Sequence, residues 1–162
     1  MDAMVVINLS KITLLQNLAE NIRVVIPHKV FEESVENSLG RYNDALITEG
    51  LIKNGNIMVL DVNEDRLKGI ERFGLIGGEA EVVALYMDGK YVAVASDDDA
   101  VRANRALLNL EVVGTPAIIR WMFEKGIIAK KKAVESLEEL KTIGWFEKGL
   151  LDRIIGGIEI DG

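Results

Sequence analysis

The residues of this sequence that could do chemistry are mainly carboxylates. The chain contains 26 Asp and Glu, one histidine and no cysteine, which excludes cysteine nucleophiles, thiolate metal sites and metal sites built from several histidines. Carboxylate oxygens are hard ligands that suit Mg²⁺ or Mn²⁺. If several carboxylates converge, their mutual repulsion favours the binding of such a cation. The acidic residues that stand out by their position are Asp2, Glu32, Glu33, Glu79, Glu81, Asp97, Asp98 and Asp99.

Helical and strand patterns alternate along the chain, which indicates an α/β fold with a mostly parallel central sheet. No repeat or linker divides the sequence, so a single domain over residues 1–162 is predicted. The apolar run at 91–95 is typical of a central, buried strand. The other strands are predicted over 23–26, 57–62 and 111–113, with a further edge strand over 158–160.

These elements would position the acidic residues. Asp97 and Asp98 follow the strand at 91–95, Glu33 comes one helical turn after the strand at 23–26, and Glu79 opens a helix. Functional groups gather beyond the carboxyl ends of parallel strands, so an acidic crevice is expected there. Acidic residues at these places are also typical of helix caps and solvated helix faces, and spacing alone leaves both interpretations open.

Charge and hydropathy narrow the class of protein. The net charge of −7 and the pI near 4.8 argue against a nucleic-acid coat protein but allow an enzyme that acts on nucleic acid. No apolar run approaches the length of a membrane span and no export signal is present, so no membrane association and a cytoplasmic location are expected. The apolar segment at 121–123 is typical of core or dimer contacts, and a homodimer is expected.

Taken in order, several segments resemble the PIN domain, and specifically its VapC-like branch. The resemblance spans about residues 2–125, and the helices predicted over 130–155 are appended to it. The segments that carry it are Asp2 with the run Ile-Asn-Leu-Ser-Lys-Ile at 7–12, Val-Ile-Pro at 25–27 with Val30 and Glu33, Gly-Glu-Ala-Glu at 78–81, Asp97-Asp98 with Arg102, and Gly114-Thr115.

This resemblance implies a three-layer α/β/α fold and an endoribonuclease that depends on Mg²⁺ or Mn²⁺. It further implies a toxin role with a cognate antitoxin protein. Glu81 would be a weaker metal ligand than its neighbour Glu79, and Thr115 would orient the site or a water molecule. The implied metal-binding carboxylates are Asp2, Glu33, Glu79, Asp97 and Asp98.

The first of these positions departs from the family pattern. Only Met1 precedes Asp2, where family members have several strand residues, and Ala3 and Met4 replace small hydroxyl residues. In an alternative register, residues 3–7 form the first strand and Asn8 takes the carboxylate position. We favour Asp2, because the alternative spoils the match up to Glu33.

Three functional classes therefore stay open. The first is the metal-dependent ribonuclease. The second is a non-catalytic PIN-like protein that binds nucleic acid or a partner through a degraded acidic site, as the Asn8 register would imply. The third is an unrelated α/β enzyme or a receiver domain with an acidic pocket, for which the expected order of lysine and aspartate is not found.

Overall fold

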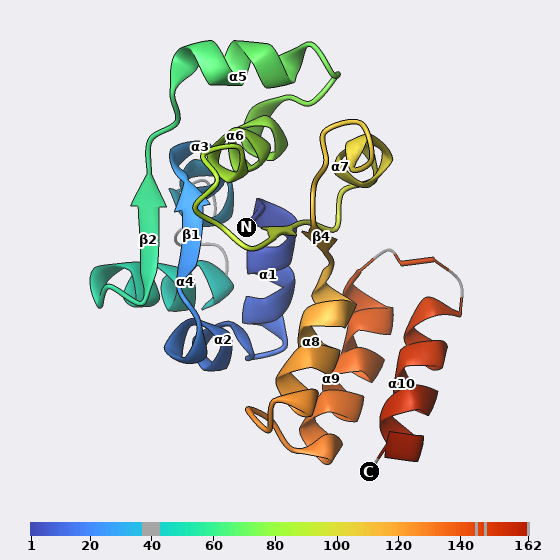
Figure 1. Ribbon diagram of the computed structural model, residues 1–162. Helices are drawn as coiled ribbons and strands as arrows, with labels where there is room; N and C mark the ends of the chain where they lie inside the picture. Colours follow the sequence, from blue (N-terminus) through green and yellow to red (C-terminus); the bar gives the residue numbers. More distant parts are fainter. Residues whose placement is uncertain (37–42, 145, 148, 162) are drawn as a thin grey trace.

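The structure is a computed structural model that describes residues 1–36, 43–144, 146–147 and 149–161. Helices and short strands alternate along it (Figure 1). The helices are α1 (Ala3–Lys11), α2 (Leu15–Asn21), α3 (His28–Phe31), the π-helix η1 (Glu32–Glu36), α4 (Asn43–Lys53), α5 (Glu64–Glu71), α6 (Gly77–Tyr86), α7 (Asp99–Asn104), α8 (Thr115–Glu124), α9 (Lys130–Ile143) and α10 (Leu150–Asp161). The strands are β1 (Val24–Pro27), β2 (Ile57–Leu60), β3 (Val94–Ala95) and β4 (Val112–Val113).

The described strands form two parallel pairs. β1 pairs with β2, with Val24 opposite Ile57, and β3 pairs with β4, with Val94 opposite Val112. Helices α3 and α6 pack against β1, and α4 packs against β2. Parallel strands connected through helices confirm the predicted α/β class.

The first two residues of the chain lie between these strand pairs. The Met1 amine donates a 2.9 Å hydrogen bond to the Val25 carbonyl of β1. The Asp2 N–H donates a 2.9 Å bond to the Ala95 carbonyl of β3. The N-terminus therefore connects the two pairs.

The predicted central strand at 91–95 is shorter than expected. Only Val94–Ala95 is a strand, and the side chain of Val92 is 93% exposed. On the β4 side, the Val94 and Ser96 N–H groups donate to the carbonyls of Glu111 and Val113. The backbone of 91–93 has no such ladder among the described residues, so the apolar sequence alone does not make it a strand.

Two further predictions are corrected at the ends of the chain. Residues 3–7 belong to α1 and not to a strand, because Asp2 caps that helix, so the alternative register is wrong. Residues 158–160, predicted as an edge strand, lie in α10. There Ile158 is buried among the core residues, whereas Ile160 is exposed.

Helix α1 lies in the middle of the molecule (Figure 1). Val5, Val6 and Leu9 are fully buried, and α1 contacts α2, α4 and α8. Because these side chains are buried, most of the surface of α1 faces other helices and not solvent. A helix that is apolar on most sides is typical of a core element.

The three C-terminal helices α8, α9 and α10 pack together on one side of α1 (Figure 1). Lys132 of α9 donates through Nζ to the Ile12 carbonyl and to Thr13 Oγ1, both at 3.0 Å, at the end of α1. Met122 is fully buried, and Trp121 packs against the core. Among the described residues, no helix combines the length and apolar character needed to cross a membrane.

Candidate functional site

The carboxylate of Asp97 accepts three hydrogen bonds, from Thr115 and Asn8. It follows β3, and its Oδ1 accepts a 2.7 Å bond from the Thr115 N–H at the start of α8. Its Oδ2 accepts from Thr115 Oγ1 at 2.5 Å and from Asn8 Nδ2 at 3.0 Å. The first N–H groups of a helix have no partner inside the helix, so the start of α8 is a natural anchor for a carboxylate.

Gly114 leaves the room that Asp97 occupies. A Cβ built on Gly114 would lie 2.9 Å from Asp97 Oδ1, closer than real Cβ contacts allow. The Gly-Thr pair at 114–115 therefore has two functions at this point. The glycine admits the carboxylate, and the threonine binds it.

Asp2 is buried beside Asp97. Its side chain caps α1, with Oδ1 accepting a 2.8 Å bond from the Val5 N–H. Its Oδ2 is buried and has no hydrogen-bond partner. Burial raises the pKa of Asp2, the Ser96 hydroxyl and the Val5 N–H oppose that shift, and the charge of Asp97 adds to it.

A second group of carboxylates surrounds the start of α6. Burial raises the pKa of Glu79, and the neighbouring charges of Asp98 and Glu33 raise it further. Glu79 and Asp98 line a common cavity of about 120 Å³. The backbone N–H of Glu79 lowers the pKa of the Glu79 carboxyl.

The neighbours of Glu33 and Asp98 fix their positions. A Cβ on Gly78 would lie 2.7 Å from Glu33 Oε2, so the Glu33 carboxylate rests on the glycine backbone at the start of α6. Asp98 caps α7 by accepting a 3.0 Å bond from the Val101 N–H. The capping interpretation of Asp98 is therefore confirmed.

The predicted residues thus fall into two groups. We call Asp2, Thr115 and the half-buried Asp97 the inner group, and Glu33, Glu79 and Asp98 the outer group. The adjacent residues Asp97 and Asp98 connect them. Across the part of the chain that the structure describes, no three carboxylates lie close enough together to be identified as ligands of one ion.

Glu81 belongs to neither group. Its Oε2 accepts a 3.0 Å bond from the Lys29 N–H in the first turn of α3. Nearby, Glu32 forms an exposed ion pair with the Lys29 ammonium at 2.8 Å, and that lysine lowers the pKa of Glu32. His28 lies 3.8 Å from Glu32 on the same exposed turn. Glu81 therefore stabilises the start of α3, and Glu32 contacts Lys29 and His28 on its exposed surface.

Sequence reasoning did not identify Asn8 and Ser96 as parts of this site. Asn8 is buried inside α1 and binds Asp97, although the sequence suggested it only as a substitute for the first carboxylate. Ser96 is fully buried, lowers the pKa of Asp2, and accepts a 3.1 Å bond from the Asp98 N–H. For Asn8, the available signal was a polar residue in a largely apolar helix, which usually has a specific partner; Ser96 gave no such signal.

A family model described as PIN domain matches residues 1–158. Comparison with curated proteins and with solved structures gives no significant match. The parallel strands with their flanking helices agree with the family match. The chain therefore belongs to the PIN domain family, whose members are generally nucleases.

Proposed function

We propose that this protein is a metal-dependent endoribonuclease that cleaves RNA phosphodiester bonds. The observation that carries the proposal is the buried Asp2 Oδ2, which has no hydrogen-bond partner and lies beside Asp97. A buried carboxylate oxygen without a donor is costly, and a cation removes that cost. Family membership supports the nuclease class, and the acidic residues support the metal dependence.

The donor set fits a hard divalent cation. All the candidate ligands are carboxylates, which suit Mg²⁺ or Mn²⁺, and such ions retain several waters instead of requiring a closed protein cage. Asp2 and Asp97 of the inner group would hold the ion. Glu33, Glu79 and Asp98 of the outer group are further candidate ligands, but among the described residues no three carboxylates lie close enough together to share one ion. A bound ion would supply a water of lowered pKa and would offset the charge of the phosphate.

The residues of the chain would do the positioning. Thr115 and Asn8 donate to Asp97 and fix the direction of its carboxylate. Asp98 is fixed by the N–H of Val101. No histidine base is needed, because a bound ion would supply a water of lowered pKa. The single imidazole, that of His28, is on an exposed turn beside Glu32.

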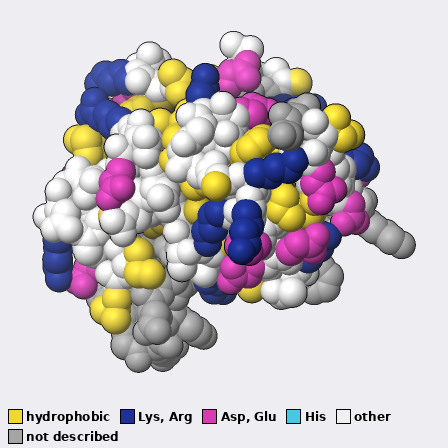
Figure 2. All heavy atoms as spheres, turned by 90° about the horizontal axis from the view of Figure 1, so that it is seen from below, with side chains coloured by type: hydrophobic (Ala, Val, Ile, Leu, Met, Phe, Trp, Pro, Cys, Tyr) yellow, Lys and Arg dark blue, Asp and Glu magenta, His cyan; other side chains and the backbone are white. Residues whose placement is uncertain are grey.

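The charge of the surface indicates that RNA would approach the acidic residues only when metal ions are bound there. On the face shown in Figure 2, basic and acidic side chains are intermixed and form no continuous basic field. With a net charge of −7, attraction of a polyanion cannot come from the chain as a whole. Cations at the acidic groups would make the local field much less negative.

A cognate antitoxin and a toxin role in the cytoplasm, as in VapC-like proteins, are part of the proposal. Ile76 precedes α6, lines the cavity that Glu79 and Asp98 share, and is 72% exposed. A protein partner that covers the acidic site would contact this side chain. A homodimer is likewise proposed, although Met122 and Trp121 already pack within one chain.

One observation favours a second candidate, a PIN-like protein that binds RNA or a partner without cleaving. Both oxygens of Asp97 already accept hydrogen bonds from Thr115 and Asn8. A carboxylate satisfied in this way has less need of a metal ion.

The test is RNA cleavage with Mn²⁺, with Mg²⁺ and with a chelator. Asp97→Asn should lower the cleavage rate by about 10²-fold or more, as the loss of one charge stabiliser does. Asp99→Asn is the matched control, because Asp99 is two positions away and its side chain is 99% exposed. Metal-dependent cleavage by the wild type that only Asp97→Asn removes supports the nuclease. RNA binding without cleavage under every condition supports the second candidate.

A further inference from the structure

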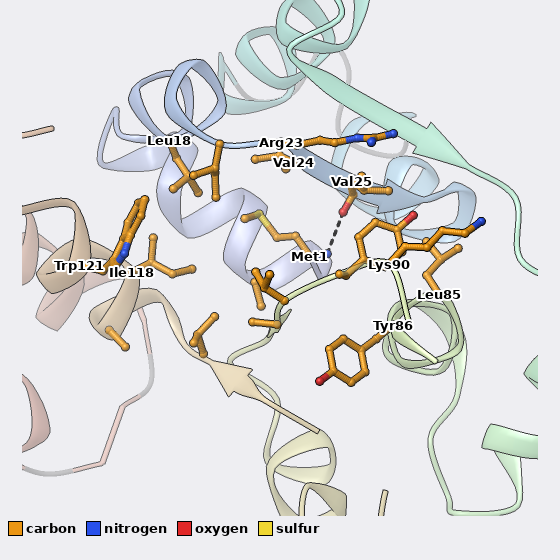
Figure 3. A pocket seen from close by; sticks show the side chains of 17 residues that line it. Met1, Leu18, Arg23, Val24, Val25, Leu85, Tyr86, Lys90, Ile118 and Trp121 are labelled. Carbon is orange, nitrogen blue, oxygen red and sulfur yellow. Dashed lines mark hydrogen bonds between the residues drawn. The ribbon is translucent and has the colours of Figure 1, made fainter. Parts of the chain in front are cut away.

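The outer group of carboxylates is continuous with the loop between α5 and α6. The cavity of about 120 Å³ that Glu79 and Asp98 share is also lined by Gly74 and Ile76 of this loop. A larger, mostly apolar cavity of about 560 Å³ lies between β1 and α8 (Figure 3), and no described carboxylate lines it. A ligand that reaches the outer group therefore meets the loop at 72–76 and not the larger cavity.

This loop is fixed against α7. Asn104 donates through Nδ2 to the Phe73 carbonyl at 3.3 Å and to the Ala100 carbonyl of its own helix at 3.0 Å. The Phe73 N–H donates to the Ile70 carbonyl at 2.9 Å. Gly74 then turns the chain with a φ of +78°, which glycine adopts without strain. The loop is therefore preformed beside the end of α7.

Large apolar side chains of the loop are exposed at this place. Phe73 is 39% exposed, and Ile76 is 72% exposed. Covering such side chains is favourable, so a ligand that lies over them gains binding free energy. An aromatic ring is the group on which an unpaired nucleobase stacks, and it accepts any base because every base has a π-face.

Two arginines beside these apolar residues have no ion pair with any part of the chain that the structure describes. Arg72 belongs to the loop, Arg105 is the C-cap of α7, and both are exposed. By contrast, Arg102 donates to the Asp99 carboxylate and to the Asp97 carbonyl. In a chain of net charge −7, unpaired arginines next to acidic residues favour an anionic ligand, and a guanidinium matches the geometry of a phosphate.

We propose that Arg72, Phe73, Ile76 and Arg105 form a subsite for one unpaired nucleotide of an RNA strand. The base stacks on the Phe73 ring and contacts Ile76, and the two arginines bind the adjoining phosphates. The subsite rests on the proposed function, because it places this nucleotide next to the phosphate that the acidic residues would meet. It adds a requirement that carboxylates do not impose. The RNA must be single-stranded here, since a base stacked within a duplex has no free face for the ring.

The test is the binding of a short fluorescent RNA, measured by anisotropy in Mg²⁺. Every chain compared carries Asp97→Asn, so that the RNA stays intact. Phe73→Leu keeps an apolar side chain without a ring and should weaken the binding of single-stranded RNA by about tenfold, whereas Phe73→Tyr should preserve it. Fully paired RNA should not distinguish these variants. Arg105→Gln should weaken binding and lower the slope of log affinity against log salt by about one.

Ile160→Ala and Arg153→Gln are the matched controls, because both side chains are exposed on α10, which packs against α8 and α9. They should bind RNA as the parent chain does, and the Tm of each variant shows that it is folded. Undiminished binding by folded Phe73→Leu would overturn the subsite and would indicate a protein partner for these apolar side chains. An equal loss in the controls would also overturn it.

The subsite and the nuclease can fail separately. Metal-dependent cleavage by the wild type, together with undiminished RNA binding by Phe73→Leu, overturns the subsite and leaves the nuclease in place. Weaker binding by Phe73→Leu, with no cleavage by the wild type in Mg²⁺ or Mn²⁺, supports the subsite and overturns the nuclease.

Discussion

Asn8 Nδ2 donates a 3.0 Å hydrogen bond to Asp97 Oδ2 and connects the middle of α1 to the loop after β3. Thr115 Oγ1 donates to the same oxygen from α8. Asp97 is therefore held by neutral donors from two helices, and its direction depends on both.

Asn8→Ala should remove one of these donors and lower the free energy of unfolding by about 1–3 kcal/mol, because a hydrogen bond to a carboxylate is lost. The RNA cleavage rate should fall as Asp97 gains freedom. Asn21→Ala is the control, since exposed Asn21 donates only to the Asn17 carbonyl within its own helix. Urea unfolding and cleavage assays measure the two effects. A loss of stability as small as that of Asn21→Ala would show that the Asn8 bond is not significant.

Mn²⁺ should raise the Tm of the wild type. At a hundred times its dissociation constant, an ion that binds only the folded state adds about 2.7 kcal/mol. Asp97→Asn with Asp98→Asn should abolish this rise. The metal-free double variant should be less stable than the wild type, because an amide at position 97 keeps only one acceptor oxygen for the donors of Thr115 and Asn8, whereas asparagine still caps α7. Calorimetry with and without Mn²⁺ tests this, and an undiminished rise in the double variant would contradict it.

The pH dependence follows from Asp2 and Glu79. Their pKa values in the folded protein are raised above the ordinary 3.8 and 4.5. The stability that they contribute is complete below those ordinary values and is lost as the pH rises through the raised ones. Asp2→Asn, which keeps the cap of α1, and Glu79→Gln should therefore increase the urea midpoint of the metal-free protein at pH 7. The gain should vanish at about pH 3, and Asp99→Asn should show none at either pH.

Gly78→Ala should displace Glu33. The new Cβ would lie 2.7 Å from Glu33 Oε2 and 3.1 Å from Val30 Cγ2. Alanine normally stabilises a helix by about 1 kcal/mol over glycine. Because of the clash, Gly78→Ala should not raise Tm as this preference would, and the rate of RNA cleavage should fall. Gly69→Ala in α5 is the matched control, because nothing lies within 4 Å of its Cβ. Equal Tm values and equal cleavage in the two variants would contradict the expected contact.

Much of the local structure could be predicted from sequence because the signals are short-range. The strand predicted over 57–62 contains β2 (Ile57–Leu60), and Asp98 caps the next helix as an aspartate in that place usually does. The helix that Glu79 was expected to open is α6 (Gly77–Tyr86). Such features depend on a few neighbouring residues.

The remainder depends on partners far along the chain. Residues 91–93 have strand composition but no ladder partner among the described residues, and no local pattern could show this. The sequence suggested Asn8 only as a substitute for the first carboxylate, whereas the structure places it inside α1, six positions after the cap Asp2. Its bond to Asp97 joins residues 89 positions apart. The division of the carboxylates into two groups likewise arises from packing.

The position of α1 also has a kinetic consequence. This helix brings Asn8 to Asp97, and Asp97 in turn binds Thr115, so these contacts span 89 and 18 positions. Contacts between distant parts of a chain form slowly, because the loop between them must close first. In stopped-flow refolding, helical ellipticity should therefore return before the ability to cleave RNA. A nascent chain still lacking α8 would have its acidic residues but no Thr115 to orient them, so the catalytic arrangement would arise only late in synthesis.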